Sequence, residues 1–279
     1  MKRIFLLAAI CLGLVSCESA EPGPLDTIKE TPGLCGIFRH WGFIGDSLSS
    51  GEMEHIKADG DTGWKDLFDY SWPQYMMRAM GAEGTNWTKG GLRTDTWTFR
   101  FIDEGQSGWT ADGHPSVFME DPKQAYVIAL GVNDKFYDPI PHIPLGNPAE
   151  DICLEDFSRN NKTYAGYYGA IIQRIRLIEP RARIFVLTMP PFFDHSFEDY
   201  SRVVREIAAL FDHVYVLDLE KELPDYNDRI IKEHSMGGHL TASGYQISAN
   251  IVMTYIDWII RHNPGEFSDA AFIGTKYHR

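Results

Sequence analysis

Positive charge is scarce in this chain. It holds 26 lysines and arginines against 39 aspartates and glutamates, which gives a formal net charge of −13. Nucleic acids and anionic membrane surfaces attract basic proteins, so this balance argues against either as a partner and leaves the fold open. Internal repeats and low-complexity tracts are also lacking. The apolar fraction of 44% is ordinary for a globular chain and is enough for a sizeable core.

Cysteine is scarce too, with four in 279 residues. None stands with histidine or another cysteine at the spacing of a metal site, so we expect no metal, and nothing in the sequence calls for a cofactor. Cys11 and Cys17 lie near the N-terminus, which leaves Cys35 and Cys153 in the folded part. The sequence allows either a Cys35–Cys153 disulfide or two free buried thiols, because it does not fix the geometry that a disulfide needs.

The N-terminus has the pattern of a targeting segment. Lys2 and Arg3 precede an apolar run from Ile4 to Val15, which is too short to span a bilayer. The run ends in Leu-Val-Ser-Cys at positions 14–17, which resembles the lipobox of bacterial lipoproteins. The resemblance implies acylation at Cys17, which would become the new N-terminus.

We therefore expect a lipoprotein signal peptide over residues 1–16 and a flexible tether over residues 17–33. Two or three acyl chains at Cys17 would anchor the protein stably to a membrane outside the cytoplasm, in the periplasm or at the cell surface. The alternative is a plain secretory signal with an incidental cysteine.

Beyond the tether, buried strands alternate with amphipathic helices. This alternation predicts an α/β fold with a central parallel sheet and helices on both faces, a three-layer αβα sandwich. We expect a single domain over residues 34–279, with a C-terminal tail after Asn263, and a long loop from Ser49 to Gly63. The expected strands are Ile37–Gly45, Thr85–Thr88, Gln124–Leu130, Arg183–Thr188 and Val214–Leu217. The expected helices are Asp69–Met80, one starting near Thr94, Tyr164–Ile178, Tyr200–Phe211 and one from an N-cap at Thr241 to Asn263.

Polar or flexible groups follow three of the expected strands. The first strand runs into Gly-Phe-Ile-Gly-Asp-Ser-Leu-Ser at 42–49, the second into Gly90-Gly91, and the third into Gly131-Val132-Asn133-Asp134. His239 stands immediately before the last helix. Because parallel strands end at one edge of a sheet, we expect these groups to converge there.

Such an edge can carry acyl transfer. Ser47 is a weak nucleophile unless a base takes its proton, and His239 is the natural base. The backbone N–H groups of Ser47 and Gly91 and the Asn133 amide would form an oxyanion hole. Each residue alone also has a structural explanation as a turn serine, a turn glycine, a helix cap or a helix-flanking histidine. Their joint occurrence, in order along one rim, favours catalysis.

These segments resemble the GDSL, or SGNH, hydrolases. Ile44-Gly45-Asp46-Ser47-Leu48 matches the first block of that family, Gly91 the second, Gly131-Val132-Asn133-Asp134 the third and His239 the fifth. The resemblance covers nearly all of the mature chain. It implies a flavodoxin-like sandwich and metal-free ester hydrolysis through an acyl-enzyme, on substrates that in the family include carbohydrate O-acetyl groups, lysophospholipids and thioesters.

From the resemblance and the expected location we predict a carbohydrate O-acyl, most simply O-acetyl, esterase acting on a glycan or small-molecule ester. One alternative is a lysophospholipase or lipase-like esterase, which would need an apolar acyl channel. Another is a non-catalytic glycan-binding lipoprotein whose hydrolase site has decayed.

One position departs from the family. The family usually places an aspartate three residues before the histidine, and here that residue is Met236. The acid orients the imidazole and stabilises its charged form. Three explanations stay open: a backbone carbonyl orients His239, another acid substitutes, with Glu233 the first candidate, or the enzyme is impaired.

Tryptophans are scattered among the segments at this rim. Exposed rings there would stack on sugar faces, whereas buried rings would belong to the core. Gly108-Trp109 is the best candidate for a sugar platform. The tryptophans concerned are Trp64, Trp87, Trp97 and Trp109. Three further polar residues could also lie near the site: Asp194, His195 and His234.

Overall fold

The computed structural model describes residues 23–25, 28, 32–136, 142–190, 196–223 and 232–277. The expected signal peptide over residues 1–16, Cys17 and most of the tether lie outside the described residues, as do Cys11, Asp194 and His195. Among the described helices, none is both long and apolar enough to cross a membrane.

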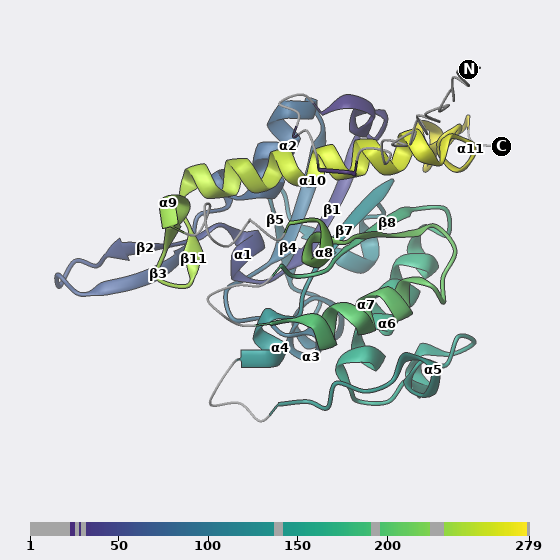
Figure 1. The fold of residues 1–279 in the computed structure, drawn as a ribbon, viewed down its shortest axis with the longest axis horizontal. Helices are drawn as coiled ribbons and strands as arrows, with labels where there is room; N and C mark the ends of the chain where they lie inside the picture. The colour runs from purple at the N-terminus through teal and green to yellow at the C-terminus, as the bar shows by residue number, and fades with distance from the viewer. Residues whose placement is uncertain are drawn as a thin grey trace, which may run out of the picture.

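Within the described residues, a seven-stranded sheet with the order β6-β5-β4-β1-β7-β8-β9 forms the centre of the molecule (Figure 1). The strands from β4 to β9 in this order run parallel, and β5 and β6 extend the sheet antiparallel at one edge. The parallel sheet expected from the sequence is confirmed, with the flavodoxin-like order 2-1-3-4-5; the antiparallel edge has no counterpart in the prediction. The strands are β1 (His40–Gly45), β4 (Glu83–Thr88), β5 (Ser107–Thr110), β6 (Ser116–Val117), β7 (Ala125–Ala129), β8 (Arg183–Leu187) and β9 (Val214–Leu217).

Helices cover both faces of the sheet, which confirms the three-layer sandwich. Helices α2 and α10 pack together on one face, and α3, α6 and α7 lie on the other (Figure 1). The helices are α1 (Ser47–Ser50), α2 (Trp72–Met80), α3 (Thr94–Thr98), α4 (Val132–Phe136), α5 (Pro148–Asp151), α6 (Tyr164–Ile178), α7 (Glu198–Ala208), α8 (Leu219–Glu222), α9 (Lys232–His234), α10 (Ala242–His262) and α11 (Pro264–Phe267). Short 3-10 turns occur at Gly33–Ile37, Phe68–Tyr70, Phe118–Glu120, Phe157–Arg159 and Ala270–Phe272, and a π-helical turn at Phe99–Asp103.

Strand β1 is buried from both sides. Trp41 and Phe43 belong to the apolar cluster beneath α2 and α10, and Ile44 belongs to the cluster beneath α6. Burial of side chains of this size stabilises the fold by roughly 1.5–3 kcal/mol each. Because both faces are covered, such a strand shows as a continuous apolar run, which is why the sequence located β1 and β7.

The segment expected as a loop from Ser49 to Gly63 is instead mostly a β-hairpin, so that prediction was wrong. Strands β2 (Glu52–Ile56) and β3 (Thr62–Asp66) pair antiparallel and form an arm that projects from the body of the molecule (Figure 1). The arm leaves the sheet, so most of its side chains face solvent, and it lacks the apolar alternation that marks a half-buried strand. Its base lies against α1 and β11.

The predicted N-cap at Thr241 is confirmed. The Thr241 hydroxyl accepts a hydrogen bond from the Gly244 N–H at 3.2 Å, and α10 begins at the next residue. This cap fixes the start of α10 and with it the hairpin that carries His239.

The cysteines settle one open alternative, because Cys35 and Cys153 are both free. The Cys35 thiol is buried, donates to the Met253 carbonyl at 3.1 Å, and has a pKa that burial raises well above its usual range. Cys153 is half-buried and lies 3.4 Å from a Glu155 carboxylate oxygen.

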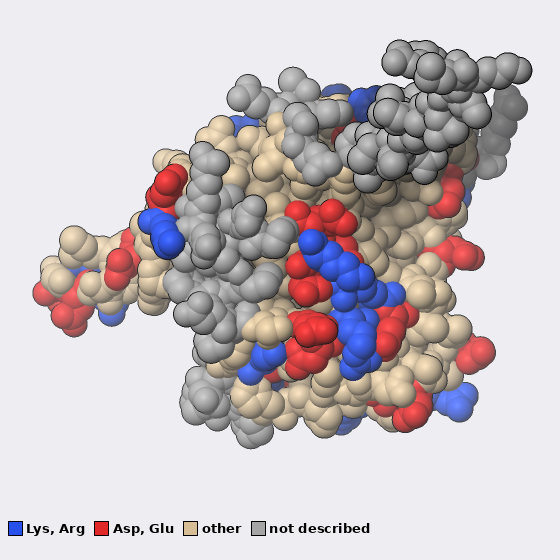
Figure 2. All heavy atoms as spheres, viewed as in Figure 1, with Lys and Arg blue, Asp and Glu red and all other residues tan. Residues whose placement is uncertain are grey.

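Charged side chains of both signs gather over α7 and α8 (Figure 2). Arg205 pairs there with Asp218 and with Glu220. Acidic and basic side chains are therefore paired with one another at this place.

Candidate active site

Ser47 lies where β1 ends. Gly45 closes the strand, and Asp46 caps α1 by accepting a hydrogen bond from the Leu48 N–H at 3.0 Å. Ser47 is the first residue of α1 and is 8% exposed. Its position is therefore the carboxyl edge of the sheet, where open α/β folds bind their ligands.

Gly91 and Asn133 follow the two strands that flank β1. In the register of the sheet, Gly45 pairs with Thr88 of β4 and with Ala129 of β7, so the three strands end at one level. Gly91 has a φ of +77°, which glycine adopts without strain. The structure thus brings the three predicted oxyanion-hole residues to one edge.

The Asn133 side chain ties two of these segments together. Its Nδ2 donates to the Leu92 carbonyl at 3.0 Å. An amide nitrogen carries two N–H donors, and no described residue accepts the second, which leaves it available to a ligand.

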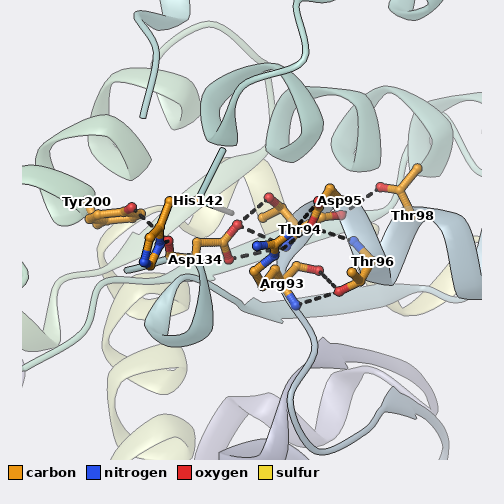
Figure 3. A network of polar contacts seen from close by, with 8 residues as sticks. All are labelled: Arg93, Thr94, Asp95, Thr96, Thr98, Asp134, His142 and Tyr200. Carbon is orange, nitrogen blue, oxygen red and sulfur yellow. Dashed lines mark hydrogen bonds and ion pairs between the residues drawn. The ribbon is translucent and has the colours of Figure 1, made fainter. Parts of the chain in front are cut away.

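Asp134 also joins these two segments (Figure 3). Its carboxylate accepts a hydrogen bond from the Thr94 N–H at 3.1 Å and another from the Thr94 hydroxyl at 2.6 Å. Its backbone carbonyl lies 3.0 Å from His142 Nδ1 and accepts from the Tyr200 hydroxyl at 3.1 Å. Thr94 and Asp134 are both fully buried. This network fixes the start of α3, which follows β4, against α4, which follows β7.

His239 is presented by a small hairpin of β10 (Ser235–Met236) and β11 (His239–Leu240). Gly237 and Gly238, with φ of +48° and +60°, form its turn, and Met236 pairs with His239 across the strands. The Met236 sulfur accepts a hydrogen bond from the Glu54 N–H at 3.4 Å. At this position the family usually has a carboxylate, and here it is a thioether.

Two side chains from the projecting arm touch the His239 ring. Glu52 places a carboxylate oxygen 2.9 Å from Nε2, and the Trp64 ring lies 4.5 Å from the imidazole, centroid to centroid. The exposed fractions of the His239 and Glu52 side chains are 17% and 18%. His239 Nδ1 is buried and has no hydrogen-bond partner among the described residues.

Ser47 and His239 lie in adjoining segments, because α1 contacts β11. Within the described chain, no hydrogen bond joins Ser47 to His239.

The acid that the sequence favoured is elsewhere. Glu233 lies on α9 with a largely exposed carboxylate, 3.8 Å from Nε2 of His234, and does not contact His239. No carbonyl among the described residues accepts from His239 Nδ1 either. The sequence pattern of residues 49–63 predicts a loop and therefore does not indicate the contact between Glu52 and His239. The position of Glu52, five residues after Ser47, is the only signal that the sequence offers for it.

Two buried carboxyl groups at this edge resist ionisation. Burial raises the pKa of Asp46 to about 7, against the opposing effects of the Leu48 N–H and His239. Burial raises the pKa of Asp134 to about 6 despite the hydrogen bonds from Thr94.

The four tryptophans divide between core and rim. Trp87 and Trp97 are fully buried. Trp64 is 42% exposed at the His239 ring, and Trp109 is half-buried and stacks on Phe68 with centroids 5.4 Å apart. Trp64 is therefore the tryptophan in contact with the candidate base, although the sequence pointed first to Trp109.

Two cavities adjoin these segments. One of about 70 Å³ is largely apolar, and the residues flanking Ser47 and His239 contribute to its wall through Asp46, Leu48 and Leu240. The other, of about 300 Å³, is lined by polar and aromatic side chains that include Lys89 and Trp109. The described residues contain no group of three or more potential metal ligands.

The fold and this edge define an α/β/α protein with the side-chain set of a serine hydrolase. A family model for the GDSL-like lipase/acylhydrolase family matches residues 43–247. The chain therefore belongs to the GDSL-like lipase/acylhydrolase family and is an ester hydrolase.

Solved structures with the same fold include two carbohydrate esterases. One is a family 2 enzyme with a carbohydrate-binding domain from Corynascus thermopiles (Myceliophthora fergusii), with a TM-score of 0.50 and 13% identity over 81% of this chain and 67% of the other. The second is a family two carbohydrate esterase from Clostridium thermocellum in complex with cellohexaose, with a TM-score of 0.50 and 16% identity over 82% of this chain and 65% of the other. The chain thus spans about two thirds of their length. No curated protein matches it in sequence.

Proposed function

We propose that this esterase removes small acyl groups, acetyl first among them, from carbohydrate, with Ser47 as nucleophile and His239 as general base. One observation carries the proposal. Ser47, Gly91 and Asn133 follow three neighbouring strands that end at the same height in the sheet, and His239 lies in an adjoining hairpin. These parts are what acyl transfer requires.

The reaction proceeds in two half-reactions, acylation and then deacylation of Ser47. As Ser47 Oγ attacks the ester carbonyl carbon, its proton passes to His239, and the carbonyl oxygen gains negative charge in the oxyanion hole. The tetrahedral intermediate then expels the sugar alkoxide, which takes the proton back from His239. Water repeats the sequence on the acyl-enzyme and releases the carboxylic acid and free Ser47.

The size of the apolar cavity supports a small acyl group. Its volume of about 70 Å³ is far below the roughly 300–1,000 Å³ of pockets that hold larger ligands. The apolar lining is the observation that favours the alternative, a lipase-like esterase with an acyl channel. The volume argues against that alternative.

The larger cavity supports a sugar as the alcohol part. It adjoins Gly90 through Lys89, and Phe68 and Trp109 supply an aromatic wall. Trp64 adds an exposed ring beside His239. The two carbohydrate esterases of the same fold agree with this choice of substrate class.

The mechanism is tested with p-nitrophenyl acetate and a fluorophosphonate probe on the wild type and S47A. We expect turnover and stoichiometric labelling of the wild type, and loss of both in S47A. Equal turnover in S47A would exclude Ser47 as the nucleophile. A wild type that neither turns over nor labels, yet binds glycan, would favour the decayed-site alternative.

Acyl length and leaving group are tested separately. With p-nitrophenyl esters from acetyl to dodecanoyl, we expect kcat/KM to fall steeply with chain length. Acetylated oligosaccharides should be better substrates than lysophospholipids, and the opposite order would establish the lipase-like alternative.

We also propose that the protein is anchored outside the cytoplasm by acylation of Cys17, on the strength of its lipobox-like sequence alone. Radiolabelled palmitate should enter the wild type and not C17S expressed in a bacterium. Equal labelling of both would leave only a secretory signal.

A further inference from the structure

The Glu52–His239 contact fills the gap left by Met236. A histidine base needs a partner that fixes its tautomer and stabilises its cationic form. Glu52 Oε2 lies 2.9 Å from His239 Nε2, and Nδ1 is buried without a partner in the described chain. A carboxylate at Nε2 requires a proton there, which leaves the lone pair on Nδ1.

Glu52 is itself held from two sides. Its backbone pairs with Asp66 across the arm, and its carbonyl accepts from the Tyr245 hydroxyl at 2.9 Å. Its side chain packs against Gly90, where an added Cβ would clash with Oε1. The Gly90 N–H donates to an Asp66 carboxylate oxygen at 3.0 Å, which fixes this glycine against the base of the arm.

The glycine pair after β4 therefore has two separate uses. Gly91 has a positive φ and supplies the candidate oxyanion donor, whereas Gly90 has an ordinary φ and provides room for the Glu52 carboxylate.

We propose that Glu52 is the positioning acid of this esterase and that it holds His239 as the Nε2–H tautomer, so that Nδ1 takes the serine proton. The inference rests on the proposed function. In the first half-reaction the Ser47 Oγ–H bond breaks and an Nδ1–H bond forms, while Glu52 stays ionised beside the imidazolium. The proton leaves Nδ1 with the alcohol. The acid thus comes from the arm after the first sequence block and not from the segment that carries the histidine.

The kinetic test compares E52Q with E54Q. Glu54 is exposed on the same strand, so E54Q serves as the matched control. We expect E52Q to lower kcat on p-nitrophenyl acetate by about 10²–10⁴-fold with KM within threefold, by analogy with loss of the acid in serine proteases, and E54Q to stay within twofold of wild type. E52D, which keeps the charge, should exceed E52Q at least tenfold. An E52Q that retains a third of the wild-type kcat would overturn the proposal.

G90A provides a second route if E52Q folds poorly. It leaves the carboxylate chemically intact and displaces it from His239, so kcat should fall, and the E52Q/G90A double variant should be little worse than E52Q alone. If the losses of kcat in E52Q and G90A were fully additive in the double variant, the two substitutions would not act through the same Glu52–His239 contact, and the proposal would be overturned.

The tautomer is read directly by ¹⁵N NMR of the histidine-labelled, full-length protein, with H239N to assign the signals. We expect a protonated Nε2 and an unprotonated Nδ1 at neutral pH, and the Nδ1–H tautomer would refute the proposal. This readout needs no substrate. A wild type inactive on every ester would sink the proposed function while leaving the tautomer measurable, whereas an active wild type with an active E52Q would sink only the role of Glu52.

Discussion

The Thr94 hydroxyl donates to the Asp134 carboxylate at 2.6 Å in a place where both side chains are fully buried. This hydrogen bond joins the start of α3, just after the loop that carries Gly91, to α4, which carries Asn133. The proposed oxyanion hole is therefore supported by a buried contact that never meets the substrate.

T94V tests this support against T94S. Valine keeps the shape and removes the hydroxyl, leaving the Asp134 carboxylate short of a donor, which should lower the free energy of unfolding by about 1–3 kcal/mol. Serine keeps the donor and loses a methyl group, at about 1 kcal/mol. We expect kcat to fall in T94V and to stay near wild type in T94S. Urea unfolding measures the stability of the two variants, and p-nitrophenyl acetate kinetics measure their kcat. Equal kcat values in T94V and T94S would show that this hydrogen bond does not contribute to catalysis.

Asn133 should act on the transition state more than on substrate binding. N133A removes the candidate oxyanion donor, and loss of one such donor costs about 10²–10³-fold in kcat. KM should change by less than a few-fold. N133D, which places an acceptor where a donor is needed, should be slower still. An N133A within threefold of wild type in kcat would remove Asn133 from the oxyanion hole.

Gly237 and Gly238 form a matched pair beside the base. Both have positive φ, so alanine at either strains the turn by roughly 1–2 kcal/mol. An added Cβ at Gly237 would lie 2.7 Å from the Trp64 ring, whereas nothing lies within 4 Å of one at Gly238. Because Trp64 rests on His239, we expect kcat/KM of G237A to be at least tenfold below that of G238A, with similar melting temperatures.

The sequence predicted the body of the molecule better than its arm. Strands such as β7 and β8 lie between helical layers, and their burial leaves an apolar run that the sequence displays. The β2–β3 arm leaves the sheet and is stabilised by pairing with itself and by contacts at its base, so its local pattern resembles a loop. Strand β5 likewise joins the sheet through pairing of Asn86 with Trp109, which neither residue type indicates.

The same limit applies to the site. Ser47, Gly91 and Asn133 follow strands, so strand order alone placed them at one edge. Glu52 reaches His239 only because the arm folds back beside α1, a relation between segments nearly two hundred residues apart that no local pattern encodes. Glu233, which is near His239 in sequence, was the natural expectation and points to His234 instead.

Asp46 should make the stability of this protein depend on pH. Burial raises its pKa in the folded state to about 7, from an ordinary value near 3.8, so the folded state binds more protons than the unfolded state between these values. Its contribution to stability is fully present below about pH 4 and is lost as the pH rises through about 7. D46N removes the ionisation and keeps an N-cap acceptor. The free energy of unfolding should therefore fall by roughly 2–3 kcal/mol less in D46N than in the wild type between pH 5 and pH 8. Urea unfolding at both pH values measures this, with the exposed Asp69 as the control site in D69N. The pKa of Asp134 is raised as well, so the free energy of unfolding of D46N should still fall with pH, but by less than that of the wild type. A wild type that is more stable at pH 8 than at pH 5 would contradict the buried, protonated state of Asp46.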